Sequence, residues 1–126
     1  MTSDEAQYKQ AVREMESGDN AAKTTVALCK LTGRGTVIDA DEAVVLLEER
    51  VKDRDNEAKW MLGLCCEYGM GTEQDIERAK VLYRESSEGG SEIGNVLSGN
   101  DENGRGCGFL RLTLGRSLLN LQNFIT

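Results

Sequence analysis

Residues 56–91, NEAKWMLGLCCEYGMGTEQDIERAKVLYRESSEGGS, decide the fold that we expect for this chain. Residues 57–68 are rich in helix-forming residues, and the glycines Gly69 and Gly71 that follow are typical of a chain that leaves a helix. Residues 76–88 favour a second helix, since their apolar residues recur at helical spacing. These apolar residues are Ile76, Ala79, Leu82 and Tyr83. The stretch therefore predicts a helical hairpin.

The same pattern occurs once before, over residues 20–55, at a shift of 36 residues. We call residues 20–55 the first unit and residues 56–91 the second unit. The identical pairs are Asn20/Asn56, Ala22/Ala58, Lys23/Lys59, Leu28/Leu64, Cys29/Cys65, Gly33/Gly69, Gly35/Gly71, Thr36/Thr72, Asp39/Asp75, Ala43/Ala79, Val45/Val81, Leu46/Leu82 and Glu49/Glu85. Most of them are small, apolar or turn-forming, so the repeat carries packing rather than chemistry. A repeat of this length predicts a helical solenoid.

The second unit resembles a Sel1-like repeat, a relative of the tetratricopeptide repeat. The residues that match the pattern of that family are Ala58, Leu62, Gly63, Gly69, Gly71, Asp75, Ala79, Tyr83 and Gly90. In the first unit the matching residues are Ala22, Gly33, Gly35, Asp39 and Ala43. The first unit departs from the pattern at Ala27, Lys30 and Arg54, where the family has Gly, Tyr and Gly. The resemblance implies an all-α fold, an α-α superhelix of helix-turn-helix repeats with flanking capping segments.

We expect a repeat domain over residues 1–99, followed by a divergent apolar and basic tail over residues 100–126. The repeat domain would contain a capping helix at 3–17, repeats at 20–55 and 56–91, and a partial third repeat from residue 92. At a shift of 71 residues, four residues of the capping segment are identical to residues of the second unit. These pairs are Lys9/Lys80, Arg13/Arg84, Glu14/Glu85 and Gly18/Gly89. The match predicts that the capping helix is the second helix of an incomplete earlier unit.

The tail differs in composition from the rest of the chain. Residues 104–126 contain no acidic residue, although the chain has 22 in total. Their apolar spacing fits both a strand and a helix, so the sequence leaves the secondary structure open. Three interpretations remain for the tail: a capping helix on the solenoid, an element that forms a homodimer, or the start of a further domain.

Composition argues against several classes of function. The net charge of −7 is unsuited to nucleic acid or to an anionic membrane surface, because both carry negative charge. No apolar run approaches the roughly 20 residues of a spanning helix, and the polar N-terminus does not look like a secretory signal. We therefore expect a cytoplasmic protein.

Candidate catalytic and metal-binding residues are lacking in the sequence. The chain has no His, the usual acid–base residue, and no Ser or Cys has a base at a readable spacing. The four cysteines, Cys29, Cys65, Cys66 and Cys107, include no CxxC pair, which disfavours a zinc site. We interpret them as small buried residues. We expect no enzyme, metal or cofactor.

The resemblance implies a different class of function, an adaptor or scaffold module that takes part in protein–protein interaction. We expect such a module to bind a protein or peptide partner on its first-helix face, which would be concave. The candidate partner-binding residues on that face are Lys23, Thr24, Lys30, Lys59, Trp60 and Glu67. Trp60 either anchors a partner, as Trp does in many interfaces, or packs against the neighbouring repeat. Two alternatives are a structural or oligomerising fragment of a larger multidomain protein and a small-molecule hydrolase.

Overall fold

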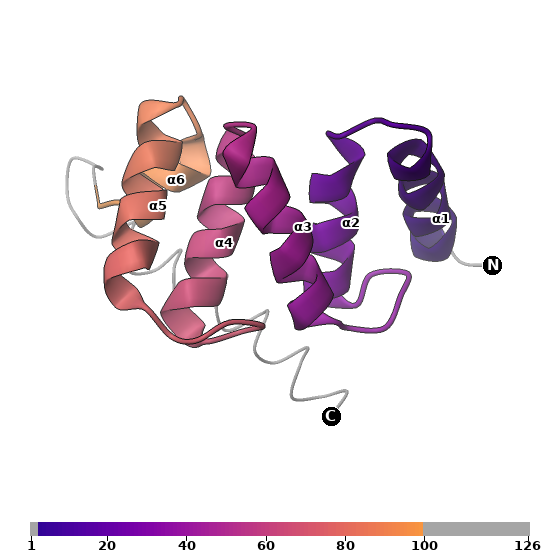
Figure 1. Cartoon of the computed structure of the whole chain (residues 1–126), viewed down its shortest axis with the longest axis horizontal. Coiled ribbons are helices and arrows are strands. Elements are labelled where there is room, and N and C mark those ends of the chain that lie inside the picture. The colour runs from indigo at the N-terminus through magenta and orange to yellow at the C-terminus, as the bar shows by residue number, and fades with distance from the viewer. Residues whose placement is uncertain (1–2, 100–126) are drawn as a thin grey trace.

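The computed structural model describes residues 3–99, which form six α-helices and no strand. The helices are α1 (Ser3–Glu16), α2 (Ala22–Thr32), α3 (Ala40–Lys52), α4 (Asn56–Tyr68), α5 (Ile76–Glu88) and α6 (Glu92–Leu97). Each helix packs on the next one in sequence. Figure 1 shows them arranged in a row, with α1 at one end and α5 and α6 at the other. The predicted all-α solenoid is confirmed, and the expected helix boundaries differ from the observed ones by at most one residue.

The residues that are identical between the two units make the same backbone contacts. Gly33 and Gly69 end α2 and α4 in the left-handed conformation, with φ of 75° and 68°. Their N–H groups donate to the carbonyl oxygens of Cys29 and Cys65, which closes each helix as a left-handed glycine commonly does. The repeat therefore fixes where each first helix ends.

The second helices begin in the same way in both units. The Asp39 side chain accepts a hydrogen bond of 3.1 Å from the Glu42 N–H, and Asp75 accepts one of 3.0 Å from the Arg78 N–H. Each aspartate satisfies a backbone donor that has no partner inside the helix, and such a cap typically contributes about 1 kcal/mol. These two acids therefore serve as helix caps, which accounts for their presence in both units.

A third set of side chains, which accept hydrogen bonds from backbone N–H groups at or just before each first helix, follows the same period of 36 residues. Asp19, Asp55 and Ser91 are spaced by 36 residues and precede α2, α4 and α6. Asp19 accepts a hydrogen bond from the Ala21 N–H, Asp55 accepts from the N–H groups of Glu57 and Ala58, and Ser91 accepts from the Gly94 N–H. The helix α6 therefore follows Ser91 as α4 follows Asp55, one period later.

The register of α1 follows from two glycines in the connections. Gly35 and Gly71 have φ of +74° and +71°, and a side chain there would collide with the carbonyl groups of Asp4 and Ala40 respectively. Asp4 therefore occupies in α1 the position of Ala40 in α3, exactly one period earlier. The register of α1 against α5 is therefore 72 residues rather than the 71 that the sequence match indicated. Only this register aligns Gly18 with Gly90, which also has a positive φ.

The outer side of α1 is polar at positions where the other second helices are apolar. Gln7 and Gln10 are exposed and correspond to Ala43 and Leu46, which belong to the core or pack against it. The Gln10 side chain donates a hydrogen bond of 3.0 Å to Glu14. A polar side of this kind suits a helix that caps a solenoid, because it needs no apolar partner.

The core is densest around α4. Every residue from Trp60 to Cys66 is buried, and a Cβ on Gly63 would lie 2.6 Å from the ring of Tyr83. In α3, Val44 is buried, whereas Leu46 is only half-buried. The reason is that the connection through Gly71 lies against the Val44 side chain. Ile76, in the first turn of α5, is 42% exposed rather than buried.

The interpretations of the tail as a capping helix, a dimerisation element or a further domain lie outside the described residues, and so does Cys107. Within residues 3–99, no helix has both the length and the apolar character that crossing a membrane requires.

Candidate partner-binding site

Trp60 is buried and does not lie exposed on the first-helix face. Its side chain is 7% exposed and belongs to the core, and its indole N–H donates a hydrogen bond of 2.6 Å to Glu57. The cause is the central position of α4, which contacts α2, α3, α5 and α6. Of the two alternatives for Trp60, contact with a partner or packing against neighbouring helices, the structure shows packing.

Lys23 and Lys30 are half-buried and pair with α3 rather than facing an open groove. The Lys23 Nζ lies 2.9 Å from Glu49, and the Lys30 Nζ lies 3.2 Å from Glu42. Lys30 also lies 5.7 Å from the centre of the Tyr8 ring, a distance at which a cation–π contact is effective. Burial alone would lower the pKa of Lys30, but Glu42 and Tyr8 outweigh it and raise that pKa above its usual value.

The Thr24 side chain forms a hydrogen bond at the junction between the two units. Its hydroxyl donates a hydrogen bond of 2.6 Å to Asp55, whose other oxygen accepts from the N–H groups of Glu57 and Ala58. Arg50 lies 3.2 Å from the same carboxylate. Burial alone would raise the pKa of Asp55, but the hydrogen bonds from Thr24, Ala58 and Arg50 hold it below its ordinary value. The sequence did not single out Asp55, although its carboxylate joins α2, α3 and α4.

The last two of the six residues lie on opposite ends of α4. Glu67 accepts a hydrogen bond of 3.0 Å from the hydroxyl of Tyr83, which fixes it against α5. Lys59 is half-buried at the other end and lines a groove. The six candidate residues therefore do not form one surface, and among them Lys59 alone lines this groove.

This groove has a volume of about 610 Å³ and lies where the end of α3, the start of α4 and the end of α5 meet. We call it the junction groove. Its lining residues are Val51, Lys52, Arg54, Asn56, Lys59, Glu85, Glu88 and Gly89. The Asn56 side chain donates a hydrogen bond of 2.8 Å to the carbonyl of Gly89, which holds α4 against the end of α5. A volume of this size falls in the range of grooves that bind ligands.

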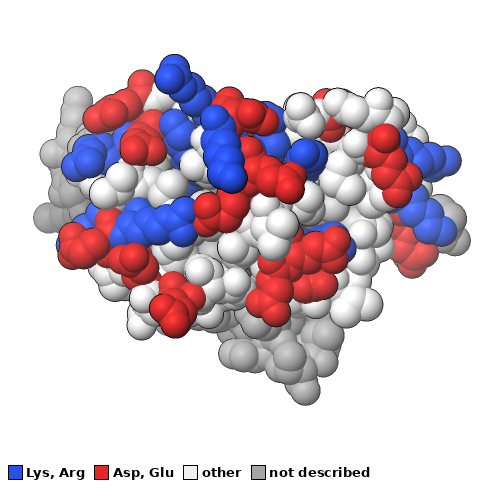
Figure 2. Space-filling model, in the orientation of Figure 1, with Lys and Arg blue, Asp and Glu red and all other residues white. Residues whose placement is uncertain are grey.

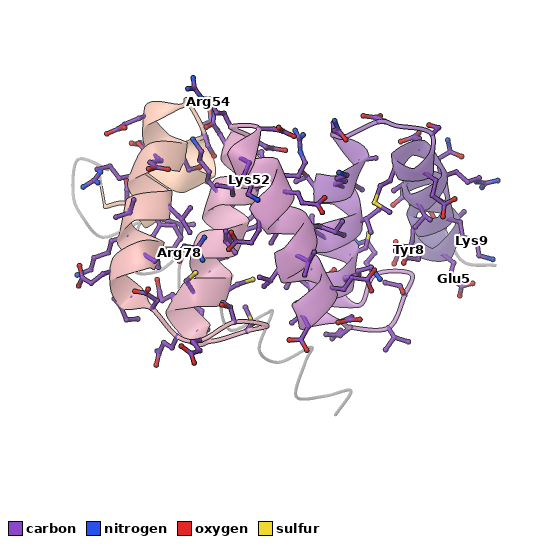
Figure 3. All side chains as sticks on the ribbon, in the orientation of Figure 1. Glu5, Tyr8, Lys9, Lys52, Arg54 and Arg78 are labelled. Carbon is purple, nitrogen blue, oxygen red and sulfur yellow. The ribbon has the colours of Figure 1, made fainter. Side chains whose placement is uncertain are left out.

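Three cations line one side of the junction groove: Lys52, Arg54 and Lys59. Lys52 and Arg54 are exposed, and Figure 3 shows both near the upper edge of the molecule. Lys23, Lys30, Arg34, Arg50, Arg78 and Lys80 form ion pairs within residues 3–99, whereas none of the three groove cations does, and neither do Lys9, Arg13 and Arg84 elsewhere on the surface. Figure 2 shows acidic and basic side chains interleaved over the rest of this face. The junction groove thus gathers three cations that form no ion pair within residues 3–99, beside two carboxylates, Glu85 and Glu88, that also line it.

Arg54 has an unusual backbone. Its φ is 61°, and no other non-glycine residue between 3 and 99 has a positive φ. One period away in each direction are Gly18 and Gly90, with φ of 109° and 101°. An Arg in this conformation costs about 1 kcal/mol or more relative to a residue that adopts it freely. The sequence marked Arg54 as a departure from the family pattern, and this departure was the available indication of the groove.

The three cysteines within residues 3–99 offer no activated nucleophile. Burial raises the pKa of Cys65 to about 12, and burial is also the main cause that raises the pKa values of Cys29 and Cys66. These thiols are therefore protonated and poorly nucleophilic at neutral pH. Residues 3–99 contain no group of three or more His, Cys, Asp or Glu residues placed to hold a metal ion.

Comparisons with known proteins support the fold. No family model matches the sequence, and no curated protein matches it. Among solved structures, the chain is similar to a Sel1 repeat protein from Oxalobacter formigenes, with 22% sequence identity and a TM-score of 0.65. The similarity covers 90% of this chain and 48% of that one, so the chain spans about half the length of this solved structure. The helical hairpins, their period and this similarity together show that the chain has the fold of a Sel1 repeat protein.

Proposed function

We propose that this chain is a non-catalytic module for protein–protein interaction that binds a peptide or protein segment in the junction groove. The groove itself carries the proposal, since it is an open concave surface lined by residues from three helices. Asn56, Lys59 and Glu85 in its lining repeat Asn20, Lys23 and Glu49, whereas Lys52 and Arg54 differ from the residues one period away on either side.

The proposed surface differs from the first-helix face that the sequence indicated. On that face Trp60 is buried, and Lys23, Thr24, Lys30 and Glu67 contact α3, α4 or α5. Of the six candidates we retain Lys59 for contact with a partner. A Sel1 repeat fold and the absence of an activated thiol in residues 3–99 both favour interaction over catalysis.

Affinity capture from cell extract tests the proposal. The full chain serves as bait beside the double variant Lys59→Glu, Glu88→Lys, which keeps the net charge but inverts two positions across the groove. The control is Lys9→Glu on α1, which Figure 3 shows at the opposite end of the molecule. We expect proteins that the wild type and the control retain and the double variant loses. The proposal fails if the folded wild-type chain retains no protein above an empty support, or if the double variant retains the same proteins.

A further inference from the structure

The end of the first unit departs from the capping segment one period earlier at the positions that form the rim of the junction groove. Lys52 and Arg54 correspond, one period earlier, to Glu16 and Gly18. Two residues with a combined charge of −1 in the earlier copy are therefore replaced by two residues with a combined charge of +2. The fold does not require this change, since the earlier copy has the same helices and turns without it.

A second difference concerns an ion pair inside the groove. Lys23 and Glu49 form an ion pair of 2.9 Å in the first unit. Their counterparts Lys59 and Glu85 are the same residue types and both line the junction groove, but they are not within 4.0 Å of each other. The Lys59 ammonium is therefore available to a ligand in a way that the Lys23 ammonium is not.

The conformation of Arg54 adds an independent argument. The backbone position suits Gly, and Gly is present in the copies on either side. Strained residues cluster at functional sites, where a role in binding can offset the stability that the strain costs. The guanidinium is a fixed fork of donors that matches a carboxylate in two parallel hydrogen bonds.

From these observations we propose that the junction groove binds an acidic peptide segment, whose neighbouring carboxylates contact Lys52, Arg54 and Lys59. Glu85 and Glu88 on the opposite side of the groove accept hydrogen bonds from the backbone N–H groups of that segment. This inference rests on the proposed function and specifies the chemistry of the partner. The net charge of −7 repels an acidic segment at long range, so the contacts act within the screening length of roughly 8 Å at physiological salt.

The probe is an acetylated and amidated hexaglutamate peptide, titrated into the full 15N-labelled chain at low ionic strength. Hexaglutamine of the same length controls for contacts that need no charge, and inorganic phosphate controls for the binding of any anion. We expect amide shift changes for hexaglutamate that are confined to residues 51–59 and 85–89. The affinity should fall as salt increases, because the contacts are between charges.

Two variants test the residues. Arg54→Gly restores the residue of the neighbouring copies and should fold at least as well as the wild type, and Lys52→Glu restores the acid of the earlier copy. Each should weaken hexaglutamate binding by about five- to tenfold, the effect of losing one charge-assisted contact. The control Lys9→Glu changes the net charge as much as Lys52→Glu and should leave the affinity within about twofold, since screening weakens distant charges.

Several outcomes would overturn the inference: no binding of hexaglutamate, equal binding of hexaglutamine, equal loss in the Lys9→Glu variant, or phosphate binding with the same dependence on Arg54 and Lys52. Failure here is distinguishable from failure of the proposed function. If the chain does not bind hexaglutamate, but the double variant still loses proteins that the wild type captures, the proposed function stands and the acidic partner is excluded.

Discussion

In the first unit two ion pairs join the two helices in addition to their buried apolar residues, whereas in the second unit a tyrosine ring packs closely against a glycine of the other helix. Lys23 and Lys30 of α2 pair with Glu49 and Glu42 of α3. In the second unit Tyr83 of α5 lies against Gly63 of α4. The same backbone architecture is therefore held together by different side-chain chemistry.

One pair of repeat positions shows how this difference arises. Lys30 and Glu42 pair within the first unit, and their counterparts in the second unit are Cys66 and Arg78. Arg78 pairs instead with Glu48 of α3 at 2.7 Å, so its charge links the two units rather than the two helices of one unit. The repeated residues therefore determine the backbone, while single substitutions determine which charged side chains pair with a neighbouring helix and which remain accessible to a ligand.

The contact between units should be the most sensitive point. Gly71→Ala places a Cβ against the Ala40 carbonyl and forces a side chain into a positive φ. We expect the free energy of unfolding to fall by about 2–4 kcal/mol, from backbone strain and overpacking together. Urea denaturation followed by circular dichroism measures the change.

Gly35→Ala is the matched variant in the first unit, where the Cβ would meet the Asp4 carbonyl. We expect a smaller loss, because the terminal helix α1 can separate locally while the rest of the solenoid stays folded. A loss as large as that of Gly71→Ala would show that α1 is as firmly integrated as α3.

The junction between the units should be sensitive to acid through Asp55. Asp55→Ala removes the cap of α4 and the contacts to Thr24 and Arg50, and we expect a loss of about 2–3 kcal/mol at pH 7. Because the pKa of Asp55 is lowered in the folded chain, the unfolded chain binds a proton more readily. Its contribution is therefore fully present above the ordinary pKa of 3.8 and is lost as pH falls below it.

Thermal unfolding between pH 7 and pH 2.5 checks this expectation. The difference in stability between wild type and Asp55→Ala should shrink below about pH 4, since protonation removes from the wild type what the substitution removes from the variant. Ser91→Ala, at the corresponding cap of α6, is the control. It should cost about 1 kcal/mol with no dependence on pH, because a hydroxyl does not titrate in this range. A constant difference for Asp55→Ala across the pH range would contradict the assignment.

The fold could be predicted from the sequence because the repeated residues act locally. Gly33 and Gly69 end helices, and Asp39 and Asp75 begin them, whatever the helices pack against. The candidate site could not be predicted in the same way. Whether Trp60 is exposed depends on how many helices surround α4, and that is a property of the assembled solenoid.

The register of α1 was missed for a related reason. Identical residues at a shift of 71 were a coincidence of surface charges, whereas the packing of Asp4 on Gly35 obeys the period of 36. The departure of Arg54 from glycine was visible in the sequence, but its meaning depended on the groove that the assembled helices form.

The smallest expected effect is an increase in the free energy of unfolding, whereas the substitutions above lower it, and it concerns a residue of the junction groove. Arg54→Gly should raise the free energy of unfolding by about 0.5–1 kcal/mol, because the relief of the strained φ exceeds the entropy that an added glycine costs. Gly90→Ala makes the reverse change at the equivalent position, where no atom lies near the added Cβ, and should lower stability by about 1 kcal/mol through strain alone. Parallel urea titrations compare the two. If Arg54→Gly instead destabilises the chain, the guanidinium contributes to the fold, and its position at the rim then needs no ligand to explain it. If the variant is more stable but binds hexaglutamate more weakly, the end of the first unit has given up stability for a cationic rim that the capping segment, with Glu16 and Gly18 at these positions, lacks.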